Sequence, residues 1–323
     1  MLIVAQAGRL EYEALLLAES LRRNAHGWQG RLIVAEPRPD AAWSGHVTAI
    51  PAPARDALQA RGAEIIPFTA RLFGAAYPYG NKIEALATLP ANENFLFLDT
   101  DTLVTGPLES VDFDFSRPSA SMRREGTWPN PPLYGPGYGD IWGALYERFG
   151  LDYATSLDLS QPDEHWERYL YFNAGWFTGP DPAEFGRRFI EWAIAIRDDP
   201  GEILASQELF PWLDQITLPL VIHSFGGGRP GPGMAGLDGD ITCHWRNLPL
   251  LYARESDAVV ATLEAAAQAP DLRPILSEWE PALRLIYQQI GPRALRPAFD
   301  RENLPLREQP LRQAIKRGGW WVV

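Results

Sequence analysis

The segment FLFLDTD at residues 95–101 constrains the fold of this chain more than any other stretch. Four apolar residues precede two carboxylates, Asp99 and Asp101, which are one residue apart. A short run that is apolar at every position is typical of a central strand with both faces covered. Because ligands of open α/β sheets bind beyond the carboxyl ends of the strands, we expect both carboxylates at a ligand-binding edge.

The N-terminal part of the chain alternates between short apolar runs and helical patterns. Apolar residues recur at helical spacing over residues 10–21, between apolar runs at 2–5 and 31–37, and a weaker run follows at 63–68. Strands that alternate with helices in this way predict a parallel α/β sheet flanked by helices.

Two further helices have recognisable start signals. One is predicted over residues 82–89, with Asn81 as its N-cap and Glu84 completing a capping box. The other begins after Asp181, which can act as N-cap, with Pro182 in the first helical position.

The second half of the chain contains two loop-like segments and a helical end. Residues 123–143 and 225–239 are rich in glycine and proline, so both are predicted to be loops, the second one flexible and able to act as a lid. The other predicted elements are a strand at 169–179, a helix near 206–215, an apolar run at 217–222, a strand at 240–245 and helices near 256–268, 278–290 and 308–317.

Charge and cysteine content exclude several classes of protein. A net charge of −12 argues against a nucleic-acid partner, which needs clustered Lys and Arg. Cys243 is the only cysteine, so an intramolecular disulfide and a cysteine-built zinc site are excluded and a cytoplasmic location is expected. No stretch approaches the ~20 apolar residues of a membrane span. Trp320 and Trp321, beside cations near the C terminus, allow at most peripheral membrane contact.

Asp99 and Asp101 have the residue type and spacing of a metal site. Residues of the same parity in an extended segment project to the same side. Neighbouring carboxylates repel unless a cation lies between them, and Mg²⁺ and Mn²⁺ often bridge protein carboxylates to phosphate oxygens. The pair therefore predicts a carboxylate–metal–diphosphate bridge. The alternative is that Asp99 and Thr100 only cap the turn after the strand.

Three motifs resemble those of one enzyme family. FLFLDTDTLV resembles the strand and DxD motif of GT-A-fold nucleotide-sugar glycosyltransferases, most closely family 8; YFNAGWFTG is similar to their Asn-Ala-Gly strand, and WLDQITL to their Asp-Gln segment. The resemblance implies an α/β fold of the GT-A type, a Rossmann-like mixed sheet flanked by helices, over residues 1–250. Residues 1–105 would bind the nucleotide and 106–250 the donor sugar and acceptor, and 251–323 would form a helical C-terminal extension.

The resemblance implies a metal site that includes a histidine. Mn²⁺ or Mg²⁺ would join Asp99 and Asp101 to the donor diphosphate, and a histidine on a late strand would complete the site. His244 in DITCHWRN fits best, and His223 is the second candidate. The family follows this histidine with a glycine and Lys-Pro-Trp, whose lysine contacts the diphosphate. Here the chain reads HWRNLP, so Arg246 is expected in the place of that lysine.

The resemblance also implies contacts with the rest of the donor. Lys82 lies close to where the family has a cation that contacts the donor, and Thr100 belongs to the DxD segment. Asn173 would form a hydrogen bond with the donor sugar, and Gly175 would let the backbone approach that sugar. The other expected residues are Asp214 and Gln215, the catalytic pair near the anomeric carbon, and Ala5, Gln6 and Tyr12 at the base and ribose, with the Tyr12 ring stacked on uracil.

The function implied is metal-dependent transfer of a hexose, with glucose or galactose as first choices, from a UDP-sugar to a carbohydrate or glycoconjugate acceptor. The resemblance implies retention of the anomeric configuration. Acceptor contacts are expected from residues 124–143 and from residues around Trp166 and Trp176.

Three alternatives remain open from the sequence. The chain could bind nucleotide-sugars without transferring them, or be a purely structural α/β protein. A phosphatase of the haloacid-dehalogenase type also has DxD after an apolar strand. It prefers threonine where this chain has Leu103, and it needs a later acidic pair, for which only Asp198 and Asp199 are available.

Overall fold

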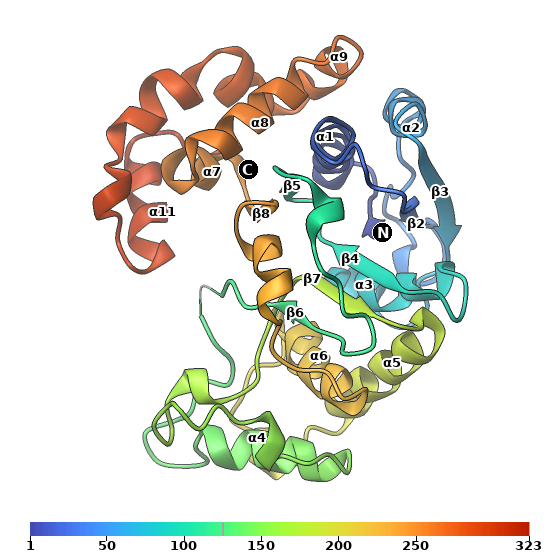
Figure 1. Cartoon of the computed structure of the whole chain (residues 1–323), viewed down its shortest axis with the longest axis vertical. Helices are drawn as coiled ribbons and strands as arrows, with labels where there is room; N and C mark the ends of the chain where they lie inside the picture. The colour runs from blue at the N-terminus through green and yellow to red at the C-terminus, as the bar shows by residue number, and fades with distance from the viewer. Residues whose placement is uncertain (125, 323) are drawn as a thin grey trace.

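The computed structural model describes residues 1–124 and 126–322, and its centre is a six-stranded sheet (Figure 1). The strand order is β3-β2-β1-β4-β7-β6, with parallel pairing from β3 to β4 and antiparallel pairing from β4 to β6. The predicted α/β class with a mixed sheet is confirmed. The strands are β1 (Leu2–Val4), β2 (Leu32–Pro37), β3 (Ala63–Phe68), β4 (Phe95–Leu98), β6 (Ala120–Ser121) and β7 (Asn173–Gly179).

Helices cover both faces of the sheet, as the apolar sequence of β4 predicts (Figure 1). These helices are α1 (Arg9–Asn24), α2 (Ala52–Gln59), α5 (Pro182–Asp198) and α6 (Leu213–Ser224). The two phenylalanines of β4 pack in one core cluster with α5 and α6. Its two leucines pack in the other cluster with α1 and α2. Both faces of β4 are therefore buried, and only its end is left to carry polar side chains.

A second, two-stranded sheet lies beyond the end of β4. It pairs β5 (Thr102–Val104) with β8 (Thr242–His244), and Thr102 lies opposite His244. The backbone N–H of Trp245 donates a 2.9 Å hydrogen bond to the carbonyl of Asp101. β5 was not predicted as a separate strand, because three residues are too few for a period to show.

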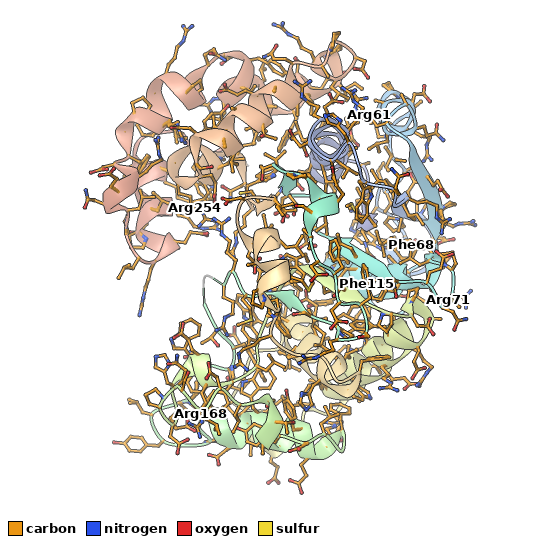
Figure 2. All side chains as sticks on the ribbon, in the orientation of Figure 1. Arg61, Phe68, Arg71, Phe115, Arg168 and Arg254 are labelled. Atoms are coloured by element: carbon orange, nitrogen blue, oxygen red, sulfur yellow. The ribbon has the colours of Figure 1, made fainter. Side chains whose placement is uncertain are left out.

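The C-terminal helices form a layer against α1 (Figure 1, orange to red). Tyr12 stacks on Trp279, with ring centroids 5.6 Å apart and planes at 3°. Arg61 pairs with both Glu19 and Asp271 at 2.8 Å (Figure 2). The predicted C-terminal helices are confirmed, the middle one as short α- and π-helical turns. The segments are α7 (Leu248–Arg254), α8 (Asp257–Ala267), α9 (Leu272–Leu276), α10 (Glu280–Ala282), π-helices Leu283–Tyr287 and Gly291–Leu295, and α11 (Glu308–Arg317).

The capping box predicted for the helix near residue 82 is wrong. α3 (Asn81–Glu84) has Asn81 as its first helical residue, not its N-cap. The Asn81 side-chain oxygen accepts a 3.2 Å hydrogen bond from Trp43 Nε1, and Glu84 accepts hydrogen bonds from the backbone N–H groups of residues 71–73. Contacts between distant segments engage both side chains, and local spacing cannot reveal such contacts.

Neither of the two predicted glycine- and proline-rich loops is wholly irregular. α4 (Tyr138–Arg148) begins inside the first, residues 123–143, of which residue 125 lies outside the described residues. The second, residues 225–239, contains the 3₁₀ helix Pro232–Asp238. A proline at the start of a helical turn loses no hydrogen bond, so these compositions do not exclude short helices.

The helix predicted near residues 206–215 is displaced toward the C terminus. α6 begins at Leu213 and continues through the apolar run to Ser224, with Pro219 inside it. Most of its side chains are buried, so no polar face marks a helical period in the sequence. β7 likewise begins at Asn173, later than predicted.

Asp238 fastens the segment at 225–239 to the central sheet. Its carboxylate accepts hydrogen bonds from the Ser121 hydroxyl at 2.5 Å, the backbone N–H of Met122 at 2.7 Å and Trp176 Nε1 at 2.7 Å. The C-terminal end of this segment is therefore tied to β6 and β7.

Replacing Asp238 by alanine should lower the free energy of unfolding by about 2 kcal/mol, because three donors lose a charged acceptor. Asp240→Ala is the matched control, since the side chain of Asp240 is exposed. Urea unfolding measures both variants. Equal losses of stability in the two would contradict the role given to Asp238.

Candidate active site

A cavity of about 750 Å³ opens at the carboxyl ends of β1 and β4. Its wall brings together side chains from the sheet, from α1, α3 and α6, and from the C-terminal helix α11. The predicted site residues that line it are Lys82, Asp99, Thr100, Asp101, Asn173, Asp214, Gln215, His244 and Arg246.

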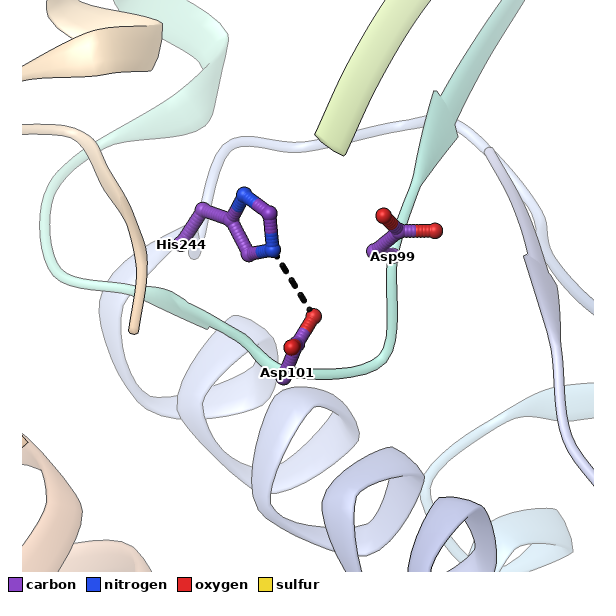
Figure 3. Close-up of side chains that lie close together, drawn as sticks. All are labelled: Asp99, Asp101 and His244. Atoms are coloured by element: carbon purple, nitrogen blue, oxygen red, sulfur yellow. Dashed lines mark ion pairs between the residues drawn. The ribbon is translucent and has the colours of Figure 1, made fainter. Parts of the chain in front are cut away.

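Asp99, Asp101 and His244 lie together at one end of this cavity (Figure 3). Each offers one ligand atom, and these atoms all lie within 4.8 Å of one another. His244 Nε2 is 3.0 Å from Asp101 Oδ1. Gly175 leaves room for the histidine, because a Cβ at that position would collide with the imidazole ring. Oxygen and imidazole ligands at this spacing suit a divalent metal such as Mn²⁺.

The other candidate histidine lies elsewhere. His223 Nε2 is 3.3 Å from the Thr155 hydroxyl, and its ring packs against Tyr146. Of the two histidines that the sequence left open, the structure brings His244 to the carboxylates.

Asp101 is ionised more readily than its burial alone would allow. Burial opposes ionisation, but His244 and Arg9, whose Nη2 lies 3.3 Å away, hold the pKa of Asp101 below its ordinary value. Arg9 also pairs with Glu13, a fully buried carboxylate that accepts a 2.9 Å hydrogen bond from the Thr100 hydroxyl. Burial and the charge of Asp101 raise the pKa of Glu13 to about 8. The sequence did not single out Arg9 or Glu13, because both sit in an ordinary amphipathic helix.

Lys82 joins the DxD segment to the Asp-Gln segment. Its Nζ lies 2.9 Å from Asp99 Oδ1 and 3.4 Å from Asp214 Oδ2, and it donates a 3.1 Å hydrogen bond to the carbonyl of Ala174. Burial opposes the charge on Lys82, but the two carboxylates raise its pKa above the ordinary value. Burial raises the pKa of Asp99, Lys82 opposes this effect and the charge of Asp101 adds to it.

Two tyrosines orient the Asp-Gln pair at the start of α6. The Tyr77 hydroxyl lies 2.8 Å from Asp214 Oδ1, and the Tyr171 hydroxyl donates to Gln215 Oε1 at 2.8 Å. Asn173 is held by its own hydrogen bonds, to the carbonyl of Arg123 and from the N–H of Gly175. Both tyrosines lie far from the pair in sequence, so no local motif predicts them.

The C-terminal helix completes the cavity wall. Arg312 and Trp321 line the cavity, although the C-terminal extension has no part in the motifs. Glu308 holds this wall in place: it pairs with Arg312, with Arg254 at 2.8 Å and with Arg246 at 3.5 Å (Figure 2 labels Arg254). Arg246, whose φ of 66° is in the left-handed region, is thereby linked to α11.

The residues predicted at the base and ribose do not line this cavity. Ala5 is buried, and Gln6 Oε1 is buried without a hydrogen-bond partner among the described residues. The Tyr12 ring is stacked on Trp279. Trp176, around which acceptor contacts were expected, is itself 2% exposed and donates a hydrogen bond to Asp238. Acceptor contacts from the residues around it stay a prediction.

A family model described as the Rhodobacterales glycosyltransferase domain matches residues 1–226 of this 323-residue chain. The chain belongs to this family. It is therefore a glycosyltransferase, as the three motifs predict, and its mixed sheet flanked by helices is the fold class predicted with them. Membership of family 8 itself stays a prediction.

Comparison with curated proteins gives no match. Among solved structures, the chain is similar to the WbbM bifunctional glycosyltransferase, with a TM-score of 0.49 and 13% identity over 85% of this chain and 50% of that one. It thus spans half the length of that chain. For galactosyltransferase LgtC in complex with donor and acceptor sugar analogues, the TM-score is 0.45 and the identity is 17%, over 83% of this chain and 95% of that one. For glycosyltransferase GlyE of Streptococcus pneumoniae TIGR4, the TM-score is 0.45 and the identity is 16%, over 86% of this chain and 63% of that one.

Among residues 1–124 and 126–322, no helix is both long and apolar enough to cross a bilayer.

Replacing Glu308 by glutamine should lower the free energy of unfolding by about 3 kcal/mol near neutral pH, because three arginines lose their shared, largely buried carboxylate. Burial opposes ionisation of Glu308, but Arg246, Arg254 and Arg312 lower its pKa below the ordinary 4.5. Its contribution should therefore be complete above pH 4.5 and be lost as the pH falls through the lowered pKa. Thermal unfolding across pH measures this.

Glu302→Gln is the matched control, since Glu302 is exposed in the same C-terminal part of the chain. A loss of stability in the Glu308 variant that matches the control, or that persists unchanged in acid, would refute the shared role of Glu308.

Proposed function

We propose that this glycosyltransferase is metal-dependent and moves a hexose from a UDP-sugar to a carbohydrate or glycoconjugate acceptor, with retention of configuration. The observation that carries the proposal is the group of Asp99, Asp101 and His244 in a cavity at the end of β4. These residues would hold Mn²⁺ or Mg²⁺, which when bound supplies charge stabilisation to the departing diphosphate.

The other cavity residues have roles that follow from their places. Lys82 and Arg246 line the cavity and would offer positive charge to the diphosphate. They would replace the lysine of the family's Lys-Pro-Trp segment, which this chain lacks. Asp214 and Gln215, fixed by their tyrosine partners, would orient the donor sugar at its anomeric carbon. Because Asp214 is already engaged by Lys82 and Tyr77, we assign it to orientation rather than nucleophilic attack. The acceptor hydroxyl would then attack on the face that the diphosphate leaves.

The nucleotide end of the site is proposed on sequence resemblance. Ala5 and Gln6 follow β1 directly, and the buried Gln6 oxygen, which has no partner in the described part of the chain, would accept a hydrogen bond from the base. Tyr12 would have to leave Trp279 to stack on uracil. We propose that residues 1–250 form the catalytic domain and that 251–323 close its cavity through Arg312 and Trp321.

One alternative has specific support. Arg246, the proposed substitute for the missing lysine, is paired with Glu308, which favours a protein that binds nucleotide-sugars without transferring them. The phosphatase alternative has less support. Asp198 pairs with Arg197 at the end of α5, and neither Asp198 nor Asp199 lines the cavity.

Calorimetric titration of UDP, GDP and ADP with Mn²⁺, and then with EDTA, tests the donor class. Of the three nucleotides, we expect only UDP to bind, and only when the metal is present. Asp101→Asn should weaken UDP binding at least about tenfold, because the metal loses a charged ligand. Hydrolysis of UDP-glucose and UDP-galactose then separates a transferase from a protein that only binds.

Asp163→Asn is the control, because Asp163 is exposed and lies outside the cavity. Unchanged UDP affinity in the Asp101 variant would remove the metal assignment, and absence of binding by all three nucleotides would remove the donor assignment.

A further inference from the structure

Arg124 occupies the sugar end of the cavity. It follows β6 in the chain and lines the cavity together with Tyr171 and Gln215. Its guanidinium lies 4.5 Å from the ring centroid of Trp166 and 5.9 Å from that of Tyr171. Since Tyr171 donates to Gln215, this guanidinium is adjacent to the pair that we place beside the anomeric carbon.

Arg124 differs from the other cations of the cavity in its partners. Lys82 pairs with Asp99, Arg9 with Glu13 and Arg312 with Glu308. Nη1 of Arg124 is buried and has no hydrogen-bond partner among the described residues. A buried guanidinium nitrogen without a hydrogen-bond acceptor costs free energy, so such a group is suited to an anionic ligand.

The charged surroundings of Arg124 do not supply that anion. Burial and the neighbouring guanidinium of Arg229 lower the pKa of Arg124 to about 10. Arg229 itself donates to the backbone carbonyls of Ser156, Glu167 and Arg168. The charge of Glu167 acts to raise the pKa of Arg124. However, the Glu167 carboxylate is half-exposed and lies 3.9 Å from His165 Nδ1. The charged group that acts most strongly on Arg124 is thus another cation, and Arg124 itself lines the cavity.

Arg124 lies beside the Asp-Gln segment, because its guanidinium contacts the ring of Tyr171, whose hydroxyl donates to Gln215. Its charged neighbours are Arg229 and Glu167. The diphosphate end has its own cation in Lys82. We therefore assign the guanidinium of Arg124 to a substituent of a sugar, and Lys82 to the leaving group.

We propose that this enzyme acts on an acidic sugar, whose carboxylate binds Arg124. The inference rests on the proposed function, because it needs the donor and acceptor sugars to meet beside Gln215. A carboxylate matches the planar fork of a guanidinium, which can donate two parallel hydrogen bonds to it. Either sugar could carry the carboxylate, so the experiment has a donor arm and an acceptor arm.

The donor arm compares UDP-glucuronate with UDP-glucose by calorimetry in the presence of Mn²⁺. The acceptor arm compares methyl β-D-glucuronide with methyl β-D-glucoside on protein saturated with UDP and Mn²⁺. In one arm, the acidic compound should bind at least about tenfold more tightly than the neutral one, which corresponds to ~1.4 kcal/mol. Arg124→Gln should bring the two affinities within about twofold, and Arg124→Lys should restore part of the difference.

Arg117→Gln is the matched control, because Arg117 is exposed and does not line the cavity. It should keep the preference for the acidic sugar, and circular dichroism checks that each variant is folded. Equal affinities in both arms of the wild-type protein, or a preference that survives in Arg124→Gln, would overturn the proposal. Failure of the wild-type protein to bind UDP with Mn²⁺ would instead refute the proposed function.

Discussion

The structure depends on gathering negative charge at the end of one buried strand. Asp99 and Asp101 follow β4, and the buried carboxylates of Glu13 and Asp214 share their cavity. Charges taken out of water in this way must be balanced nearby, or the folded state becomes less stable. The cations and the histidine around them provide that balance and fix the shape of the cavity.

The balancing groups come from distant parts of the chain. Arg9 belongs to α1, Lys82 to α3 and His244 to β8, and each lies within 3.3 Å of one of the two DxD carboxylates. The small sheet of β5 and β8 brings His244 there, since Thr102 lies opposite it. The fold therefore positions the site directly, because α1, α3 and β8 each bring one partner to the DxD carboxylates.

Sequence reasoning succeeded where a residue's role depends on its neighbours in the chain. The apolar run before Asp99 predicted a central strand, and helical spacing predicted α1. It failed where a role depends on a distant contact. Glu84 satisfies three backbone N–H groups rather than a cap, and Arg312 reaches the cavity from a helix outside every motif. No local period or spacing encodes such contacts.

The ion-pair group around Glu308 has a consequence for the order in which the site forms. It connects α11 to the residue that follows Trp245, so part of the cavity wall is synthesised long after β4. Domains fold as units while the N-terminal part emerges first. A nascent chain that already contains β4 and its carboxylates still lacks His244 and Arg312. The candidate metal site and its cavity are thus complete only after β8 and α11 have been synthesised and packed against the central sheet.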